Sequence, residues 1–153
     1  MNEYLARRDG VARREPAEAG RAHVLIVEDH AVSRDVYAGY CDLFDHTSRA
    51  VGDGSAALAA LRRERFDVVV MNVHMDGAPL ETLQAIRALP GPASRTPVIG
   101  LTAVGRHEEA QRWLGAGLSG VLPKPLTAAR LFAALNSLAH PDDGDPARSW
   151  APA

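Results

Sequence analysis

The stretch Asp67-Val68-Val69-Val70-Met71-Asn72 decides the fold class of this chain. Its apolar centre, rich in β-branched valine, is typical of a strand that is buried on both faces of a parallel sheet. Other short apolar runs stand at 23–27, 97–102 and 120–122, and a weaker strand is expected at about 47–51. A segment with helical spacing follows each of these stretches. Because strands that alternate with helices form parallel sheets covered by helices, we expect an α/β fold with a doubly wound five-stranded parallel sheet and helices on both faces.

Length and composition predict one compact domain with two tails. The chain has 153 residues, of which 46% are hydrophobic, and this is enough apolar content for one sizeable core. Residues 1–21 are rich in Arg, Ala and Glu with little apolar periodicity, and residues 140–153 are rich in Pro, Asp and Gly. We therefore expect a mobile N-terminal arm at 1–21, a folded domain at 22–139 and a flexible C-terminal tail at 140–153.

The charge pattern argues against binding to nucleic acid or to a membrane. The formal net charge is −2, and no basic stripe stands out. The apolar runs are far shorter than the roughly 20 residues that a membrane span needs, and the charged N-terminus has no apolar signal core. We expect a cytoplasmic protein with no nucleic-acid and no membrane partner.

The helix after the first strand is expected to bury one apolar stripe. Val32, Val36, Tyr40 and Leu43 recur every three to four residues, as a one-faced helix requires. The single cysteine, Cys41, lies among aromatic residues of the same segment. It is expected to be a buried small hydrophobe and not a reactive thiol.

Polar side chains stand where four of the expected strands end. They are Glu28 and Asp29, Asn72, Thr102, and Lys124. Because the carboxyl ends of parallel strands share one edge of the sheet, these side chains should meet there. Two adjacent carboxylates suit Mg²⁺, while a threonine hydroxyl and a lysine ammonium can hold phosphoryl oxygens. The set predicts a site that handles a phosphoryl group.

In these motifs the chain resembles the receiver domain of bacterial two-component response regulators over about residues 22–139. The motifs are Val27-Glu28-Asp29, Met71-Asn72-Val73-His74-Met75, Leu101-Thr102-Ala103 and Lys124-Pro125. The resemblance implies the flavodoxin-like strand order 2-1-3-4-5. It also implies that Glu28, Asp29 and the peptide carbonyl of His74 ligate Mg²⁺. Thr102 would be the switch hydroxyl, and Lys124 would contact the phosphoryl group.

The chain departs from the family pattern at the phosphoacceptor position, where the family has an aspartate and this chain has Asn72. An amide has no anionic oxygen to attack phosphorus, although its carbonyl oxygen could still ligate a cation or hold Lys124 by a hydrogen bond. Asp76 stands where the family usually has proline, and Val121 where it usually has an aromatic switch residue. With one carboxylate fewer, we expect weakened Mg²⁺ binding and greater stability without metal.

These departures predict a single-domain pseudo-receiver that acts by phosphorylation-independent protein–protein interaction and is not an enzyme. The expected partner is a histidine kinase, a phosphotransfer protein or a response regulator of a phosphorelay. A homodimer through helix 4, strand 5 and helix 5 is common in the family. The small residues Ala129, Ala133 and Ala134 would permit close packing there.

The sequence leaves other readings open. The chain could be phosphorylated on a nearby carboxylate, Asp76 or Asp29, in a Mg²⁺-dependent reaction. His30 and His74 could join Asp29 in a transition-metal site. Asn72 could be an engineered replacement of an aspartate. A flavodoxin-like nucleotide binder is a further option, but the first strand is not followed by a glycine-rich phosphate loop.

Overall fold

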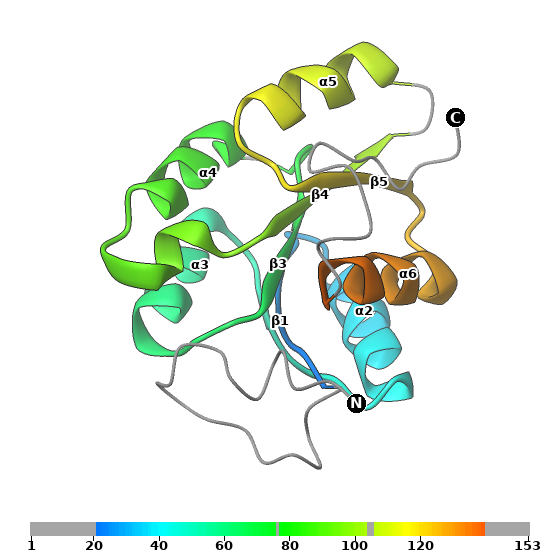
Figure 1. Cartoon of the computed structure of the whole chain (residues 1–153). Coiled ribbons are helices and arrows are strands. Elements are labelled where there is room, and N and C mark those ends of the chain that lie inside the picture. The colour runs from blue at the N-terminus through cyan, green and yellow to red at the C-terminus, as the bar shows by residue number, and fades with distance from the viewer. Residues whose placement is uncertain (1–20, 76, 104–105, 140–153) are drawn as a thin grey trace.

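The chain forms one parallel sheet in the computed structural model, which describes residues 21–75, 77–103 and 106–139. The strands are β1 (His23–Val27), β2 (Thr47–Val51), β3 (Val68–Asn72), β4 (Val98–Ala103) and β5 (Gly120–Lys124). Their order across the sheet is β2-β1-β3-β4-β5, and all paired neighbours run parallel (Figure 1). The expected fold class and strand order are confirmed.

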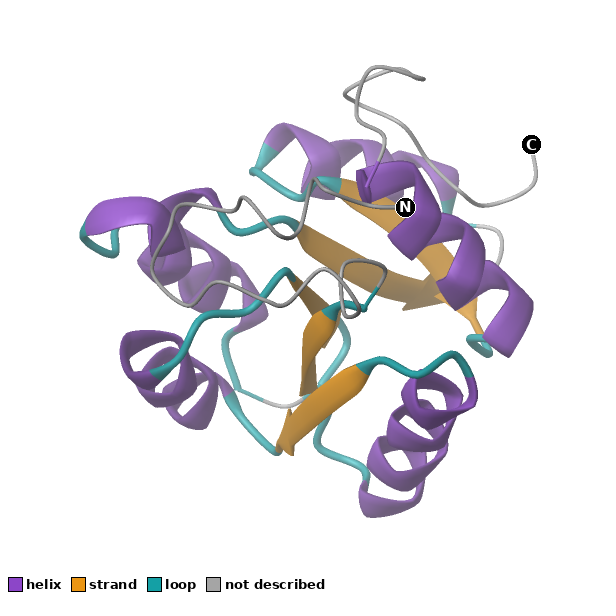
Figure 2. Ribbon diagram, turned by 60° about the horizontal axis from the view of Figure 1, so that its bottom comes forward, coloured by secondary structure: helices purple, strands orange, loops and turns teal. Residues whose placement is uncertain are grey.

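Helices cover both faces of this sheet. They are α2 (Ala31–Leu43), α3 (Gly54–Arg63), α4 (Pro79–Arg87), the 3₁₀ helix η2 (Gly91–Arg95), α5 (His107–Gly115) and α6 (Ala128–Ala139). Helices α2 and α6 lie together on one face, and α3, α4 and α5 lie on the other (Figures 1 and 2). Within the described ranges, no helix has both the length and the apolar content that crossing a bilayer would demand.

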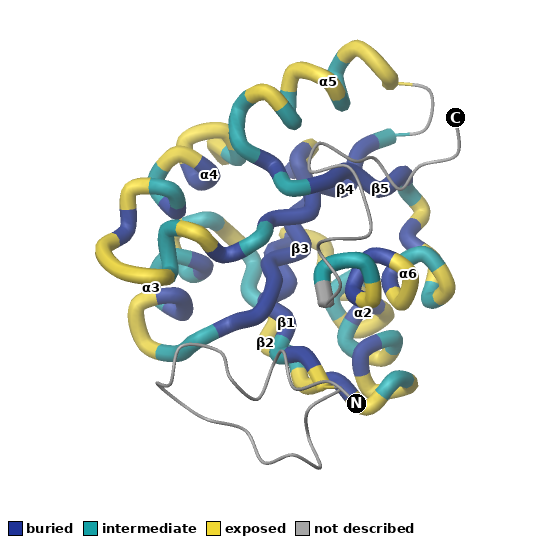
Figure 3. Tube along the Cα trace, in the orientation of Figure 1, coloured by how far each residue is buried: buried dark blue, intermediate teal, exposed yellow. Residues whose placement is uncertain are grey.

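The strand residues alternate between two apolar cores, one on each face of the sheet. In β1 and β3, one core takes Leu25, Val27, Val69 and Met71, and the other takes Val24, Ile26, Val68 and Val70. Every residue of β3 is buried, as the dark centre of Figure 3 shows. Because successive side chains of a strand point to opposite faces, burial on both faces explains why β3 has no polar residue before its end.

Three of the four residues expected to be buried on α2 are exposed, and only Tyr40 packs against the core. Val32, Val36 and Leu43 are exposed at 65%, 42% and 68%, and the helix buries Tyr37 and Cys41 instead. Both sets have helical spacing, so periodicity alone does not say which side of the helix meets the sheet. The burial of Cys41 is confirmed, and it raises the pKa of the thiol to about 11, which makes a reactive thiolate scarce at neutral pH.

The strand register brings the carboxyl ends together. Val27 pairs with Met71, so Glu28 and Asn72 each lie one residue beyond an aligned pair. On the other side of β3, Asn72 pairs with Leu101, and Ala103 pairs with Lys124 across β4 and β5. The four strand-end motifs therefore reach the same edge of the sheet.

Candidate functional site

The side chain of Asn72 connects three segments at the carboxyl edge of the sheet. Its Oδ1 accepts hydrogen bonds from Nζ of Lys124 at 3.1 Å and from the backbone N–H of His74 at 2.9 Å. Its Nδ2 donates to Oε2 of Glu28 at 3.3 Å. The structure thus brings Glu28, Asn72, His74 and Lys124 together, and the hydrogen bond expected between Asn72 and Lys124 is present.

The orientation of the Asn72 amide follows from its neighbours. An ammonium group and a peptide N–H can only donate, so the amide oxygen faces them and the amide nitrogen faces Glu28. Glu28 is 3% exposed, and its Oε2 also accepts from the backbone N–H of His30 at 3.0 Å. A buried carboxylate needs such donors. The Asn72 amide and the His30 backbone N–H therefore give the buried carboxylate of Glu28 two hydrogen-bond donors.

Arg34 and Tyr37 of α2 lie near Glu28, although no sequence motif pointed to them. Nη1 of Arg34 donates to the backbone carbonyl oxygen of Glu28 at 2.8 Å. Burial raises the pKa of the Tyr37 phenol, and the charge of Glu28 raises it further. Both residues lie in the first two turns after the β1 strand end, where a helix must pass close to that end. The short distance along the chain between the end of β1 and the start of α2 is the only feature of the sequence that could have indicated these two residues.

Thr102 and Asp29 complete the strand-end set. β4 lies between β3 and β5, so Thr102 stands between the strands that carry Asn72 and Lys124. Its side chain is buried, with 3% exposure, and its hydroxyl makes no hydrogen bond with the described residues. Asp29 follows Glu28 and is exposed. The edge therefore presents a carboxylate and a hydroxyl beside the Asn72 network.

This donor set fits Mg²⁺ only in part. Glu28 and Asp29 offer the one or two carboxylates that Mg²⁺ takes from proteins. However, Oδ1 of Asn72 already accepts two hydrogen bonds, and its amide nitrogen places a donor beside Glu28. In residues 21–75, 77–103 and 106–139, no group of three His, Cys, Asp or Glu side chains could hold a metal, which removes support for a His30–His74–Asp29 site. Glu28 and Asp29 are therefore the side chains that would hold Mg²⁺.

The side chain of His74 extends the network to α5. Its Nε2 lies 3.2 Å from Oε1 of Glu109 in the first turn of that helix. Nη1 of Arg106 lies 3.8 Å from the same oxygen. From the sequence, His74 was expected to contribute its peptide carbonyl, or its ring in a transition-metal site, and Glu109 was not identified. The two residues belong to different βα units, so no local pattern pairs them.

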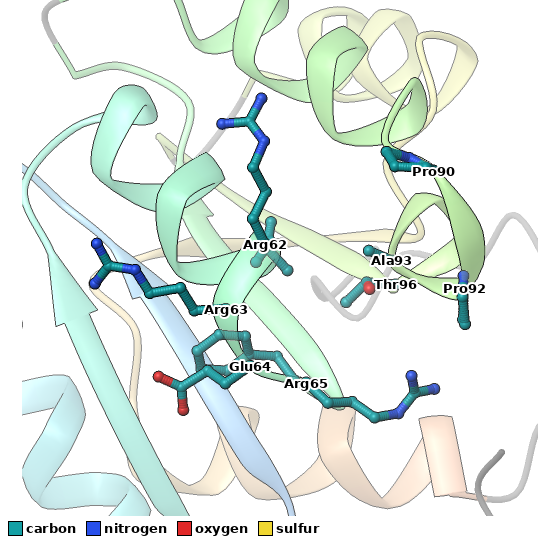
Figure 4. Close-up of a pocket in the computed structure, with 10 residues that line it drawn as sticks. Arg62, Arg63, Glu64, Arg65, Pro90, Pro92, Ala93 and Thr96 are labelled. Atoms are coloured by element: carbon teal, nitrogen blue, oxygen red, sulfur yellow. The ribbon is translucent and has the colours of Figure 1, made fainter. Parts of the chain in front are cut away.

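A hollow lies at the end of the sheet opposite to Asn72, between the end of α3 and η2 (Figure 4). It has a volume of about 250 Å³. Its lining residues are Leu61, Arg62, Arg63, Glu64, Arg65, Phe66, Pro90, Pro92, Ala93 and Thr96. Figure 4 shows the side chains of Arg62, Arg63 and Arg65 extending in different directions. Because a ligand site needs polar groups that converge, this hollow is a poorer candidate for a functional site than the strand ends around Asn72.

Some expectations lie outside the described residues or conflict with them. Asp76, the alternative acceptor, is not among the described residues, nor are residues 1–20 and 140–153. Ala134 was expected on a dimer face, but it is buried with 0% exposure. It follows Leu131 by three positions and shares the inward face of α6. Ala129 and Ala133 are exposed and remain available for a contact.

The family model of the response regulator receiver domain matches residues 24–136. The chain is 36% identical over 124 residues to the sensor histidine kinase AruS of Pseudomonas aeruginosa, a match that covers 80% of this chain and 12% of the relative. It is 36% identical over 107 residues to the sensor histidine kinase RcsC of Escherichia coli, covering 68% of this chain and 11% of the relative. The chain therefore spans only a small part of the length of these relatives.

Solved structures show the same similarity. The chemotaxis response regulator CheY4 of Vibrio cholerae superposes with a TM-score of 0.70 at 28% identity, covering 77% of this chain and 98% of the other. The receiver domain of the sensor histidine kinase PA1611 of Pseudomonas aeruginosa superposes with a TM-score of 0.70 at 27% identity, covering 78% and 98%. That structure contains a magnesium ion coordinated in its active-site cleft. In both cases nearly the whole solved chain is matched.

Proposed function

The chain belongs to the response regulator receiver domain family of two-component signalling, and we propose that it is a pseudo-receiver, which acts by protein contact and does not accept a phosphoryl group. Asn72 stands where the family pattern has its phosphoaccepting aspartate. The observation that carries the proposal is the hydrogen-bonded position of Asn72 between Glu28, His74 and Lys124. This side chain completes the site without a nucleophile.

The chemistry of the amide supports this proposal. Transfer of a phosphoryl group to a receiver needs an oxygen nucleophile aligned with the phosphodonor. The amide oxygen of Asn72 carries no negative charge, and the two hydrogen bonds from Lys124 and His74 engage both of its lone pairs. The amide nitrogen donates to Glu28 and has no lone pair to offer. Neither atom of the Asn72 amide can therefore attack phosphorus.

The surroundings of Asn72 favour a single, constitutive conformation. The neutral amide bridges the carboxylate of Glu28 and the ammonium of Lys124, so the network needs neither a phosphoryl group nor Mg²⁺. Val121, which stands where the family usually has an aromatic switch residue, is 1% exposed and packs in the apolar core. A small buried valine cannot swing between two positions as an aromatic ring does. Mg²⁺ would bind weakly at Glu28 and Asp29.

An exposed apolar band supports a role in protein contact. We define this band as Val32, Val36 and Leu43 of α2 with Phe132 of α6, which are all exposed. The ring of Phe132 packs on Phe44 with centroids 4.8 Å apart, which joins the two helices. Val32, Val36 and Leu43 share one side of α2 by their helical spacing, and exposed apolar residues gathered on one side of a molecule mark interaction surfaces. We propose that the band meets a histidine kinase, a phosphotransfer protein or a response regulator.

The chain would have no catalytic activity, no nucleic-acid partner and no membrane partner, and it would work in the cytoplasm. A homodimer through α5, β5 and α6 is a second arrangement, with Ala129 and Ala133 on the exposed face of α6.

The alternative function is a receiver phosphorylated on Asp29 or Asp76 in a Mg²⁺-dependent reaction. The exposure of Asp29 beside Glu28 is the observation that favours it.

Intact-mass analysis after incubation with Mg²⁺ and acetyl phosphate tests the proposal. The expected result is no phosphoryl adduct on the wild-type chain and a clear adduct on an Asn72→Asp variant, which restores the nucleophile. An adduct on the wild-type chain would overturn the proposal, and fragmentation of the phosphorylated peptide would then distinguish Asp29 from Asp76. If neither chain reacted, the surroundings of Asn72 would not be those of a phosphorylation site.

A further inference from the structure

One residue, His74, contacts both the amide of Asn72 and the start of α5. Its backbone N–H donates to Oδ1 of Asn72 at 2.9 Å. Its ring Nε2 lies 3.2 Å from Oε1 of Glu109, in the first turn of α5. Only Val73 separates Asn72 from His74, so a shift of this backbone must move the imidazole ring. The contacts form a continuous physical path from the end of β3 to α5.

The contact between His74 and Glu109 is largely shielded from solvent. The side chains of His74 and Glu109 are 27% and 19% exposed, and Oε1 of Glu109 is shielded from solvent. No donor is aligned to hydrogen-bond this oxygen. Its nearest polar neighbours are Nε2 of His74 at 3.2 Å and Nη1 of Arg106 at 3.8 Å. A carboxylate oxygen removed from water is costly without polar neighbours, so α5 should lie where Glu109 meets these two groups.

We propose that His74 and Glu109 are positioning residues that couple the side chain at position 72 to the placement of α5. Asn72 holds the His74 backbone, the His74 ring holds Glu109, and Glu109 anchors the first turn of α5. The biological meaning of this coupling rests on the proposed function, because it gives a receiver without a phosphoryl group a fixed position of this helix. The coupling itself is a property of the contacts.

Amide hydrogen exchange on the full-length chain, in buffer with a metal chelator, tests the coupling. In a Glu109→Gln variant, peptides from α5 should exchange roughly threefold faster or more, because a neutral amide replaces the carboxylate that contacts His74 and Arg106. The matched control is Glu108→Gln, which makes the same chemical change at an exposed neighbour in the same turn. It should leave α5 within a factor of about two of the wild type. Equal effects of the two substitutions would overturn the proposal.

A double-mutant cycle separates coupling from general loosening. Asn72→Ala removes the amide oxygen that holds His74, so it should also speed exchange in α5. If both substitutions act through His74, the double variant should exchange no faster than the faster single variant. Multiplicative effects would contradict the proposed route. Exchange in α6 serves as the internal reference, so a variant that is only less stable overall would raise both helices together.

These measurements use no phosphodonor and therefore fail or succeed separately from the proposed function. A phosphoryl adduct on the wild-type chain would overturn the pseudo-receiver and leave the coupling intact. Independent exchange at α5 would remove the coupling and leave the absence of phosphorylation unaffected.

Discussion

The two ends of the sheet use polar side chains in different ways. At the amino ends of the strands, Arg87 donates to the backbone carbonyl oxygens of Ser94, Thr96 and Gly117, at 3.1, 2.7 and 2.9 Å. At the carboxyl ends, Asn72 bonds to two side chains and one backbone N–H. Arg87 at the amino end holds loop backbone in place, whereas Asn72 at the carboxyl end mainly joins other side chains. Removal of the Arg87 guanidinium should therefore destabilise the fold more than a change of the Asn72 amide.

The contrast is visible within one strand. Asp67, just before β3, accepts a hydrogen bond from the backbone N–H of His23 at 2.7 Å and so aligns β1 with β3. Asn72, at the other end of the same strand, supports no strand pairing with its side chain. The fold uses the acid at the start of β3, and the site uses the amide at its end.

The largest expected effect is at Arg87. An Arg87→Met variant keeps much of the apolar stem and removes the guanidinium, which leaves three carbonyl oxygens without their donor. Burial lowers the pKa of this guanidinium, which reflects its partly dehydrated position. We expect the free energy of unfolding to fall by about 3 kcal/mol, measured by urea denaturation. The control is Arg95→Met at an exposed position of η2, where the change should stay within about 0.5 kcal/mol. Similar losses in both variants would contradict the comparison.

A smaller effect is expected at Asn72. In an Asn72→Asp variant, a carboxylate oxygen replaces the amide nitrogen that donates to Glu28. Without metal, repulsion between the two acids should lower the free energy of unfolding by about 1 kcal/mol, and Mg²⁺ should restore it. Asn136→Asp makes the same change at an exposed position of α6 and should show neither effect. Urea denaturation with a chelator and with Mg²⁺ measures both. A variant as stable as the wild type without metal would mean that Lys124 alone compensates the new charge.

The smallest effect is expected at Glu64, which pairs with His23 at 2.8 Å and with Arg49 at 2.6 Å at the amino end. Burial by itself would raise the pKa of Glu64, but the hydrogen bonds from His23 and Arg49 outweigh it and lower the pKa overall. A lowered folded-state pKa stabilises the protein above the unfolded pKa, and this contribution is lost as the pH falls through the folded pKa. Glu64→Gln should therefore destabilise by roughly 0.5 kcal/mol at neutral pH.

The pH dependence provides the check on this last prediction. Urea denaturation at neutral pH and in acid, below the usual carboxyl pKa of about 4.3, should show the difference between wild type and Glu64→Gln shrinking toward zero. A difference that stayed constant with pH would mean that Glu64 acts through packing and not through its charge.

Much of the site could be predicted because parallel strands bring their carboxyl ends to one edge. The motifs around Glu28, Asn72, Thr102 and Lys124 were enough to place these residues together. The contact between His74 and Glu109 could not be predicted, because it depends on how α5 packs across the strand ends. Spacing within one element does not report such a contact.

The fold shows the same division. The run 67–72 identified a strand buried on both faces, because only a central strand tolerates so continuous an apolar sequence. The face of α2 was predicted wrongly, because two apolar stripes share its helical period. Likewise, Ala134 looked like a surface residue by its size alone, yet it packs in the core beside Leu131.

The sequence by itself determined the α/β class, the positions of the strands and the absence of a carboxylate at position 72, because these depend on residue type and local order. Only the tertiary structure decided which face of α2 is buried and which way the Asn72 amide points. The amide orientation depends on Lys124 and Glu28, which come from distant parts of the chain and meet only when β5 and β1 pack around β3. Residue identity limits the chemistry, and the placement of hydrogen-bond partners in three dimensions completes the site.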